Sequence, residues 1–152
     1  MEQQQLKVFM DSVSDYFIKT TGMAIEIGVP YLLDENRSIL QNYTGVIGIS
    51  GKMQGAIYIT ADGDLLYGLM LKIMPGAQRT DKRLAGMAGE LANTIAGNAQ
   101  KTLGKEFYIS IPMLLTSKRP GGTNTFTLEV PTFVIPLRWD GHQASLVVGL
   151  KK

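Results

Sequence analysis

The chain has 152 residues, of which 45% are hydrophobic and 18% charged, and its formal net charge is +2. This balance predicts a globular chain with one domain over residues 1–152, and it argues against nucleic acid as a partner because backbone binding needs a dense basic surface. The chain has no cysteine and one histidine, which excludes disulfides, zinc–thiolate sites, cysteine nucleophiles and metal sites built from several histidines.

The N-terminal segment and the apolar runs indicate where the protein acts. Residues 1–13 lack a basic segment followed by an apolar run, so we expect no signal peptide. No apolar run reaches the roughly 18 residues that a membrane-spanning helix needs. We therefore expect a cytoplasmic protein that has no membrane partner.

The first third of the chain predicts a helix followed by three strands. Apolar residues recur at helical spacing over residues 4–20, and Gly22 is well placed to end that helix. Residues 24–33 read as a strand, and residues 44–50 and 53–60 are typical of a β-hairpin.

Two helices are predicted in the middle of the chain. The first is capped by Asp62 and ends before Pro75. The second is capped by Thr80 or Asp81 and ends near Gly104.

The last third of the chain predicts three more strands. Residues 107–116 read as a strand that a proline interrupts, and residues 117–124 read as a flexible connection. A second hairpin is expected from residues 126–138 and 143–150, with a turn at Asp140 and Gly141.

The order of the predicted elements nearly repeats itself along the chain. A helix, a strand and a hairpin are followed by an extra helix, and then by a second helix, strand and hairpin. Six strands joined by short links favour a largely antiparallel sheet with helices on one face. We therefore predict an α+β fold built from two units, each a helix plus three strands.

The second middle helix, and residues 86–103 in particular, carries the unusual pattern. Its large apolar residues form one stripe that we expect to face the core: Leu84, Met87, Leu91 and Ile95. The opposite face carries three glycines and two polar residues: Gly86, Gly89, Gly97, Glu90 and Asn93. Because residues three positions apart adjoin on a helix, the carboxylate and the carboxamide are expected side by side.

The three glycines have two possible explanations. Each costs the helix about 1 kcal/mol relative to alanine, so something must offset that cost. One explanation is close packing, in which small residues let a neighbouring element approach. The other is functional, in which a partner's backbone lies on the helix and only Glu90 and Asn93 are long enough to reach into the partner.

The familiar catalytic and binding patterns are absent from the sequence. His142 is the only histidine, is expected in a hairpin turn and has no serine or cysteine partner that we can identify. No P-loop, dinucleotide-binding motif or calcium-binding motif occurs. Basic residues cluster modestly near Arg79, and we interpret the cluster as solvated surface. Five methionines are expected to fill the core: Met53, Met70, Met74, Met87 and Met113.

The remaining candidates, Glu90 and Asn93, suit a site that is shared with another molecule. A carboxamide is no base at neutral pH, but it donates and accepts hydrogen bonds at once, so it can hold a water in line with an electrophile. That suits phosphoryl transfer, in which the protein mainly positions the attacking water. The Glu90 carboxylate repels a phosphate, so its natural partner is a basic side chain on the molecule that carries the phosphoryl group.

The sequence GELANTIAGNAQKTL resembles the helix of the CheC, CheX and FliY phosphatases of bacterial chemotaxis, and its single copy and element order look most like CheX. The signature of that family has Asp or Ser four residues before a Glu, then an Asn three residues after the Glu, and a proline about twenty residues further on. Glu90 and Asn93 match it, and Pro112 is a candidate for the proline. Gly86 departs from it at the first position.

The resemblance implies a protein phosphatase whose substrate is the aspartyl phosphate of a response regulator, phospho-CheY. It implies that the regulator supplies Mg²⁺ and a lysine, that Asn93 orients water at the phosphoryl group, and that Glu90 pairs with the lysine. It also implies a homodimer formed through the sheets. Two alternatives remain open: a non-enzymatic module that binds a response regulator or the flagellar switch, and a structural reading in which both side chains are merely solvated.

Overall fold

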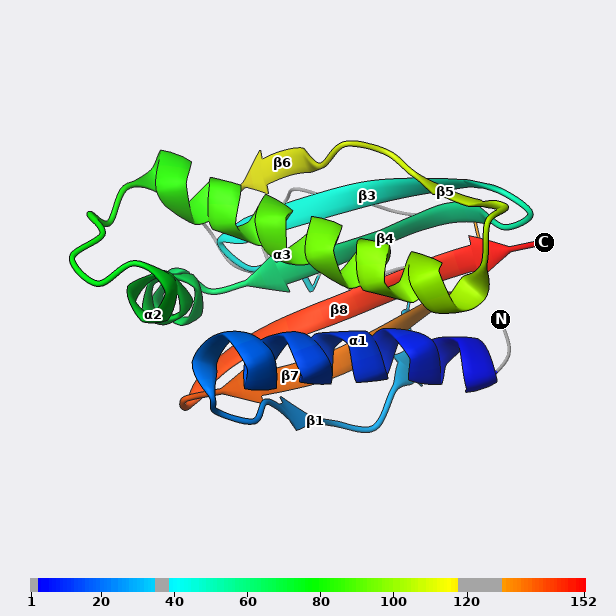
Figure 1. The fold of residues 1–152 in the computed structure, drawn as a ribbon. Coiled ribbons are helices and arrows are strands. Elements are labelled where there is room, and N and C mark those ends of the chain that lie inside the picture. Colours follow the sequence, from blue (N-terminus) through cyan, green and yellow to red (C-terminus); the bar gives the residue numbers. More distant parts are fainter. Residues whose placement is uncertain (1–2, 35–38, 118–129) are drawn as a thin grey trace.

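The computed structural model describes residues 3–34, 39–117 and 130–152, and within these ranges the chain forms three helices and eight strands (Figure 1). The helices are α1 (Gln3–Thr21), α2 (Gly63–Ile73) and α3 (Asp81–Leu103). The strands are β1 (Glu26–Ile27), β2 (Tyr31–Leu32), β3 (Tyr43–Gly51), β4 (Gln54–Ala61), β5 (Phe107–Ile109), β6 (Met113–Thr116), β7 (Thr132–Trp139) and β8 (His142–Lys151).

All eight strands belong to one antiparallel sheet, which confirms the α+β prediction. Its central order is β7-β8-β4-β3, with β1 and β2 both pairing with β7 at one edge and β5 and β6 both pairing with β3 at the other. Eight strands appear where six were predicted because two predicted strands are each split in two. Gly28 to Pro30 interrupt the first, and Ser110 to Pro112 the second, where a proline cannot donate to a ladder.

The two helix-and-strand units are interlocked rather than side by side. The short strands β1 and β2 of the first unit pair with the hairpin of the second unit, and β5 and β6 of the second unit pair with the hairpin of the first. The hairpins themselves meet along β4 and β8, where eight residue pairs are in register. Neither unit therefore completes its part of the sheet without the other.

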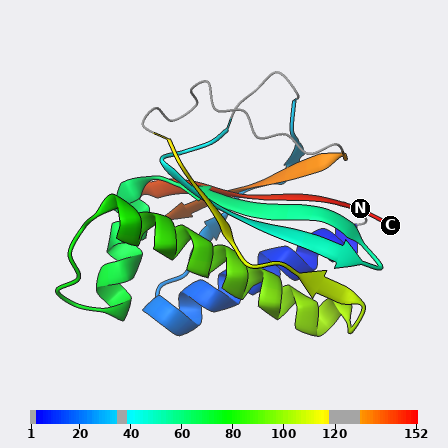
Figure 2. The same ribbon diagram turned by 90° about the horizontal axis from the view of Figure 1, so that it is seen from above.

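The helices cover one face of the sheet, as predicted (Figure 2). The main hydrophobic core lies between this face and the three helices, and it includes Phe9 and Phe17 of α1 and Leu65 and Leu69 of α2. A smaller buried cluster lies on the opposite face of the sheet: Leu40, Val46, Ala56, Tyr58, Val134 and Val147. Trp139 is buried against Phe17, with a ring centroid separation of 5.6 Å.

Helix α3 is held against the sheet by direct contact between backbones. A Cβ atom on Gly45 of β3 would lie 2.5 Å from the carbonyl oxygen of Ala88 and 2.8 Å from the Cα atom of Gly89. Only a glycine on the strand and small residues on the helix allow this approach. The contact sets the height and orientation of α3 above β3.

The helix ends and turns follow the predicted local chemistry. The Asp62 side chain accepts a hydrogen bond from the Leu65 amide at 2.7 Å, and the Thr80 hydroxyl oxygen accepts one from the Arg83 amide at 3.2 Å. Gly104 ends α3 at a φ of 108°. These caps confirm the predicted boundaries of both middle helices.

One group of predictions is wrong, and another lies outside the residues that the structure describes. Met74 and Met113 were expected in the core, but both are exposed, at the end of α2 and on the edge strand β6. The predicted connection at residues 117–124 and the first residues of the hairpin strand at 126–138 lie largely outside the described residues.

Candidate active site

Helix α3 buries one face completely, as its apolar stripe predicts. The four large residues of that stripe are buried in the main core, and so are the alanines beside them: Leu84, Met87, Leu91, Ile95, Ala88, Ala92, Ala96 and Ala99. Ser12 of α1 adds a polar contact, because its hydroxyl donates a hydrogen bond to the Ile95 carbonyl at 2.8 Å. This face fixes the rotation of the helix about its own axis.

The rotation turns Glu90 and Asn93 outward, and both side chains are exposed. Within the ranges that the structure describes, neither side chain makes a hydrogen bond or an ion pair. One turn beyond each of them along the same line lie Gly86 and Gly97, where an added Cβ would meet no atom within 4 Å. The outward stripe, defined here as Gly86, Glu90, Asn93 and Gly97, therefore presents two polar side chains and bare backbone on either side of them.

Gly89 does not belong to this stripe, which corrects the expectation that all three glycines share the exposed face. It is buried, and a Cβ there would lie 2.5 Å from Leu114 Cδ2 and 3.3 Å from Pro112 Cβ. The two explanations of the glycines thus apply to different positions. Gly89 serves close packing, whereas Gly86 and Gly97 face open space.

The packing of Gly89 brings Pro112 next to the candidate site. Pro112 precedes β6, whose pairing with β3 places the segment alongside α3 (Figures 1 and 2). Since Gly89 is the residue before Glu90 and lies one turn before Asn93, Pro112 borders the outward stripe on the β6 side. The proline that the sequence placed about twenty residues away is therefore a spatial neighbour.

Helix α1 borders the stripe on its other side through Tyr16. Burial raises the pKa of the Tyr16 hydroxyl, a hydrogen bond with Thr20 lowers it, and the negative charge of Glu90 raises it further. The last effect is the smallest of the three, and it links Glu90 on α3 with Tyr16 on α1. No local signal in the sequence indicates this pairing, because it depends on how α1 packs against α3.

The beginning of α3 is tied to β3 and to α2 by polar contacts. The Tyr43 hydroxyl donates a hydrogen bond to Asp81, and burial, together with that bond, raises the pKa of Tyr43 to about 12. Arg79 pairs with Asp64 at 2.7 Å, and its guanidinium lies 5.4 Å from the centre of the Tyr67 ring. These contacts position the loop that precedes the stripe.

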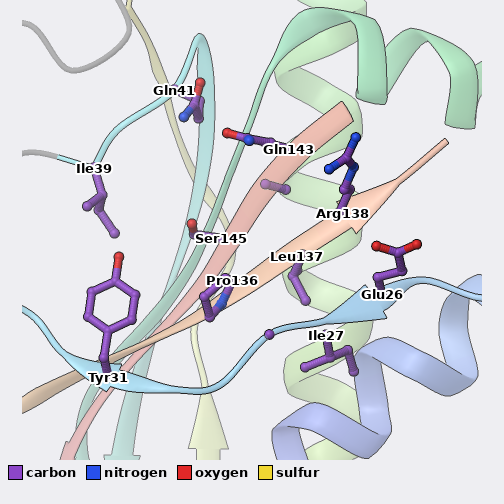
Figure 3. A pocket seen from close by; sticks show the side chains of 12 residues that line it. Glu26, Ile27, Tyr31, Ile39, Gln41, Pro136, Leu137, Arg138, Gln143 and Ser145 are labelled. Atoms are coloured by element: carbon purple, nitrogen blue, oxygen red, sulfur yellow. The ribbon is translucent and has the colours of Figure 1, made fainter. Parts of the chain in front are cut away.

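A cavity on the other side of the molecule does not include Glu90 or Asn93. It has a volume of about 520 Å³ and lies between the β1–β2 segment and the β7–β8 hairpin. Figure 3 shows Glu26 and Arg138 at one end of it and Tyr31 at the other. Glu90 and Asn93 therefore lie outside this cavity.

The structure also shows where the only histidine lies, and whether the described residues include a cluster of metal ligands or a membrane-spanning helix. His142 was expected in the hairpin turn, but it is the first residue of β8 directly after that turn, 3.9 Å from a carboxylate oxygen of Asp62. Over the described ranges, no three residues of the metal-binding types lie together. None of the three helices is both long and apolar enough to cross a bilayer in its described part.

The outward stripe allows one kind of chemistry and lacks the groups for others. An amide and a carboxylate can position water and pair with a cation, but neither is an activated nucleophile. The stripe is therefore a candidate for a site that a second molecule completes.

The family model described as "Chemotaxis phosphatase CheX" matches residues 43–138, which is more than half of the chain and contains the whole of α3. The chain therefore belongs to the CheX family. Its sequence matches none of the curated proteins with which it was compared.

Solved structures share the fold over nearly the whole chain. A CheC-like superfamily protein from Shewanella sp. PV-4 is 22% identical, with all of both chains covered and a TM-score of 0.85. The chemotaxis protein CheX from Vibrio vulnificus is 20% identical, with 97% of this chain and 99% of that one covered and a TM-score of 0.82. The CheX–CheY–BeF₃–Mg²⁺ complex from Borrelia burgdorferi includes a chain that is 21% identical, with 97% and 98% covered and a TM-score of 0.75.

Proposed function

We propose that this protein accelerates hydrolysis of the aspartyl phosphate on a phosphorylated response regulator of the CheY type, and so ends a chemotaxis signal in the cytoplasm. The observation that carries the proposal is the outward stripe of α3. There an amide and a carboxylate stand one turn apart and are flanked along the helix by two glycines whose Cβ positions are unobstructed. Membership of the CheX family supports the same reaction.

Asn93 is assigned the chemical role. Its amide holds a water in line with the phosphorus atom and opposite the bond to the aspartyl oxygen. The water oxygen forms the new bond to phosphorus, the bond to the aspartyl oxygen breaks, and the products are inorganic phosphate and the free aspartate of the regulator. Aligning a reactant in this way supplies catalysis without a protein nucleophile.

Glu90 is assigned an engagement role. Its carboxylate repels a phosphoryl group and attracts an ammonium group, so it pairs with the lysine of the regulator's phosphorylation site. In this proposal Mg²⁺ comes with the regulator. One structural neighbour was solved as a complex that contains CheY, Mg²⁺ and BeF₃, and BeF₃ stands in for a phosphoryl group.

The test is loss of label from a regulator carrying ³²P on its aspartate. Wild type is expected to accelerate the loss, and Asn93→Ala to return it to the rate of the regulator alone. Asn98→Ala is the matched control, because the same side chain is removed from the same helix five residues away, off the stripe. Chelating Mg²⁺ after phosphorylation should stop the accelerated reaction, and an active Asn93→Ala protein would remove the mechanism.

Glu90→Gln should mainly weaken productive engagement, which raises the regulator concentration needed for half-maximal rate. Glu106→Gln is its control, since Glu106 is also exposed but lies beyond the end of α3. Equal effects of the two substitutions would argue against a specific contact at Glu90.

The second candidate function is a binding module without catalysis. The fold likeness extends to a chain of the FliM–SpeE complex from Helicobacter pylori, at 11% identity and a TM-score of 0.58, and an exposed pair of polar residues also suits docking. If the protein is such a module, wild type and Asn93→Ala should bind the activated regulator equally well. Neither form should then change the rate of label loss.

We also propose a homodimer formed through the sheet. The edge formed by β5, β6 and the residues between them exposes four large apolar side chains: Tyr108, Ile111, Met113 and Leu114. An exposed apolar edge strand is a template for pairing with a second chain. Light scattering during size-exclusion chromatography should give twice the 16.6 kDa mass of the chain, and a monomer at micromolar concentration would contradict the proposal.

A further inference from the structure

An apolar groove lies beside the outward stripe, between the end of α2 and the first half of α3. Its volume is about 260 Å³, and its apolar wall is formed by Met70, Ile73 and Met74 from α2 and by Met87 from α3. Ile73 and Met74 are 50% and 57% exposed, so this wall is open to solvent. Methionine side chains adapt to the shape of whatever packs on them, which suits a surface that accepts another molecule.

The groove is continuous with the candidate active site because two residues belong to both. Gly86 and Glu90 line the groove and are also members of the outward stripe. A molecule whose phosphoryl group reaches Asn93 must lie over Glu90, and it therefore also covers the mouth of the groove. Docking in the groove and delivery of the phosphoryl group are thus two contacts of the same partner.

Gly86 keeps the groove open. No atom of the chain lies within 4 Å of the position that its Cβ would occupy, so the absence of a side chain is not required by internal packing. A longer side chain at this position would project into the groove beside Glu90. The sequence thus carries an interior helix glycine at a cost in helix propensity, at the position where it leaves room for a partner.

The charge at the rim of the groove indicates which kind of partner group would lie beside a side chain bound in the groove. Arg83 lines the groove one turn before Met87, is exposed, and makes no ion pair within the described part of the chain. The groove therefore combines an apolar wall with a free guanidinium. This combination fits an apolar side chain that has a carboxylate close by.

We infer that the groove between α2 and α3 is a docking site for the response regulator, and that it takes an apolar side chain lying beside the regulator's phosphorylation site, next to an acidic residue that faces Arg83. The inference rests on the proposed function for the identity of the partner. It adds that the groove contributes affinity beside the contact at Glu90, whereas catalysis comes from Asn93.

The test measures binding separately from turnover. The probe is the CheY-type regulator used in the label-loss assay, held in its active form by BeF₃⁻ and Mg²⁺, with the Kd measured by fluorescence anisotropy. Ile73→Gln combined with Met74→Gln makes the wall polar at two exposed positions. Gly86→Leu fills the groove from within. Leu32→Gln is the control, because Leu32 is a similarly exposed apolar residue, at 61%, on β2 at the far edge of the sheet.

Both groove variants are expected to raise the Kd at least tenfold, while Leu32→Gln leaves the Kd unchanged. For the protein with Ile73→Gln and Met74→Gln, whose changes lie off the outward stripe, kcat at saturating regulator should stay within about twofold of wild type. Circular dichroism and thermal melts establish that each variant is folded. An unchanged Kd for the groove variants would overturn the inference, as would an equal effect of Leu32→Gln.

The two proposals fail in different ways. If wild type binds the activated regulator but never accelerates label loss, the phosphatase function is wrong and the groove can still be tested by binding. If wild type accelerates label loss and the groove variants bind as tightly as wild type, the function stands and the groove plays no part in docking.

Discussion

The two faces of helix α3 differ in burial, packing and polar contacts. On one face Leu91 and Ile95 are fully buried, and the helix backbone touches β3 at Gly45. On the other face two polar side chains have no hydrogen-bond partner among the described residues and are flanked by two glycines with empty surroundings. One face therefore holds the fold together, and the other is available to another molecule. Substitutions on the two faces should change different quantities.

The largest expected effect on stability comes from the buried face. Leu91→Ala removes a fully buried side chain and leaves a cavity, so the free energy of unfolding should fall by about 2–5 kcal/mol. Urea denaturation followed by circular dichroism measures it. A loss below about 1 kcal/mol would mean that this face contributes less to the fold than its burial indicates.

Gly45→Ala should come next, because it acts on the same face from the strand side. The new Cβ would lie 2.5 Å from the Ala88 carbonyl oxygen, and two backbones cannot give way as a flexible side chain can. Overpacking of this kind costs about 1–3 kcal/mol. Gly48→Ala on the same strand is the control, since its Cβ would meet only the Ser110 side chain at 3.4 Å or more.

Alkaline pH should lower the free energy of unfolding by a smaller amount than these substitutions, through the contact of Tyr43 with the beginning of α3. The Tyr43 pKa is about 12 in the folded chain and about 10 when unfolded, so the folded state favours the protonated hydroxyl. Its contribution is complete below pH 10 and is lost as the pH rises toward 12. In Tyr43→Phe, the decline in unfolding free energy over that interval should be shallower, and an identical slope would contradict the assignment.

The smallest expected effect belongs to the exposed face. Gly97→Ala adds a methyl group that meets no atom of the chain, and it replaces a poor helix former by the best one. The free energy of unfolding should therefore rise, by up to about 1 kcal/mol. A destabilised Gly97→Ala protein in the same urea titration would show that this face is packed after all.

The sequence was sufficient where the physics is local. The caps at Asp62 and Thr80, the turn at Asp140 and Gly141, and the buried stripe of α3 depend on neighbouring residues along the chain, and the structure shows each of them. The outward direction of Glu90 and Asn93 follows from the stripe, since a helix with one buried face must turn the other outward.

What the sequence could not supply depends on tertiary contacts. Gly89 has the same local pattern as Gly86, but β6 brings Pro112 and Leu114 onto only one of the two. Met74 was expected in the core from its residue type, yet it ends α2 where no other element covers it. The exchange of strands between the two units likewise depends on pairing between distant segments.

The central claim is that Asn93 acts on a phosphoryl group that another molecule carries, and it is tested most directly by measuring binding and turnover on one variant. Asn93→Ala should bind the BeF₃⁻-activated regulator within about threefold of the wild-type Kd, while single-turnover dephosphorylation at saturating protein falls by about 100-fold or more. A single-turnover rate within threefold of wild type at the same saturation would contradict the account.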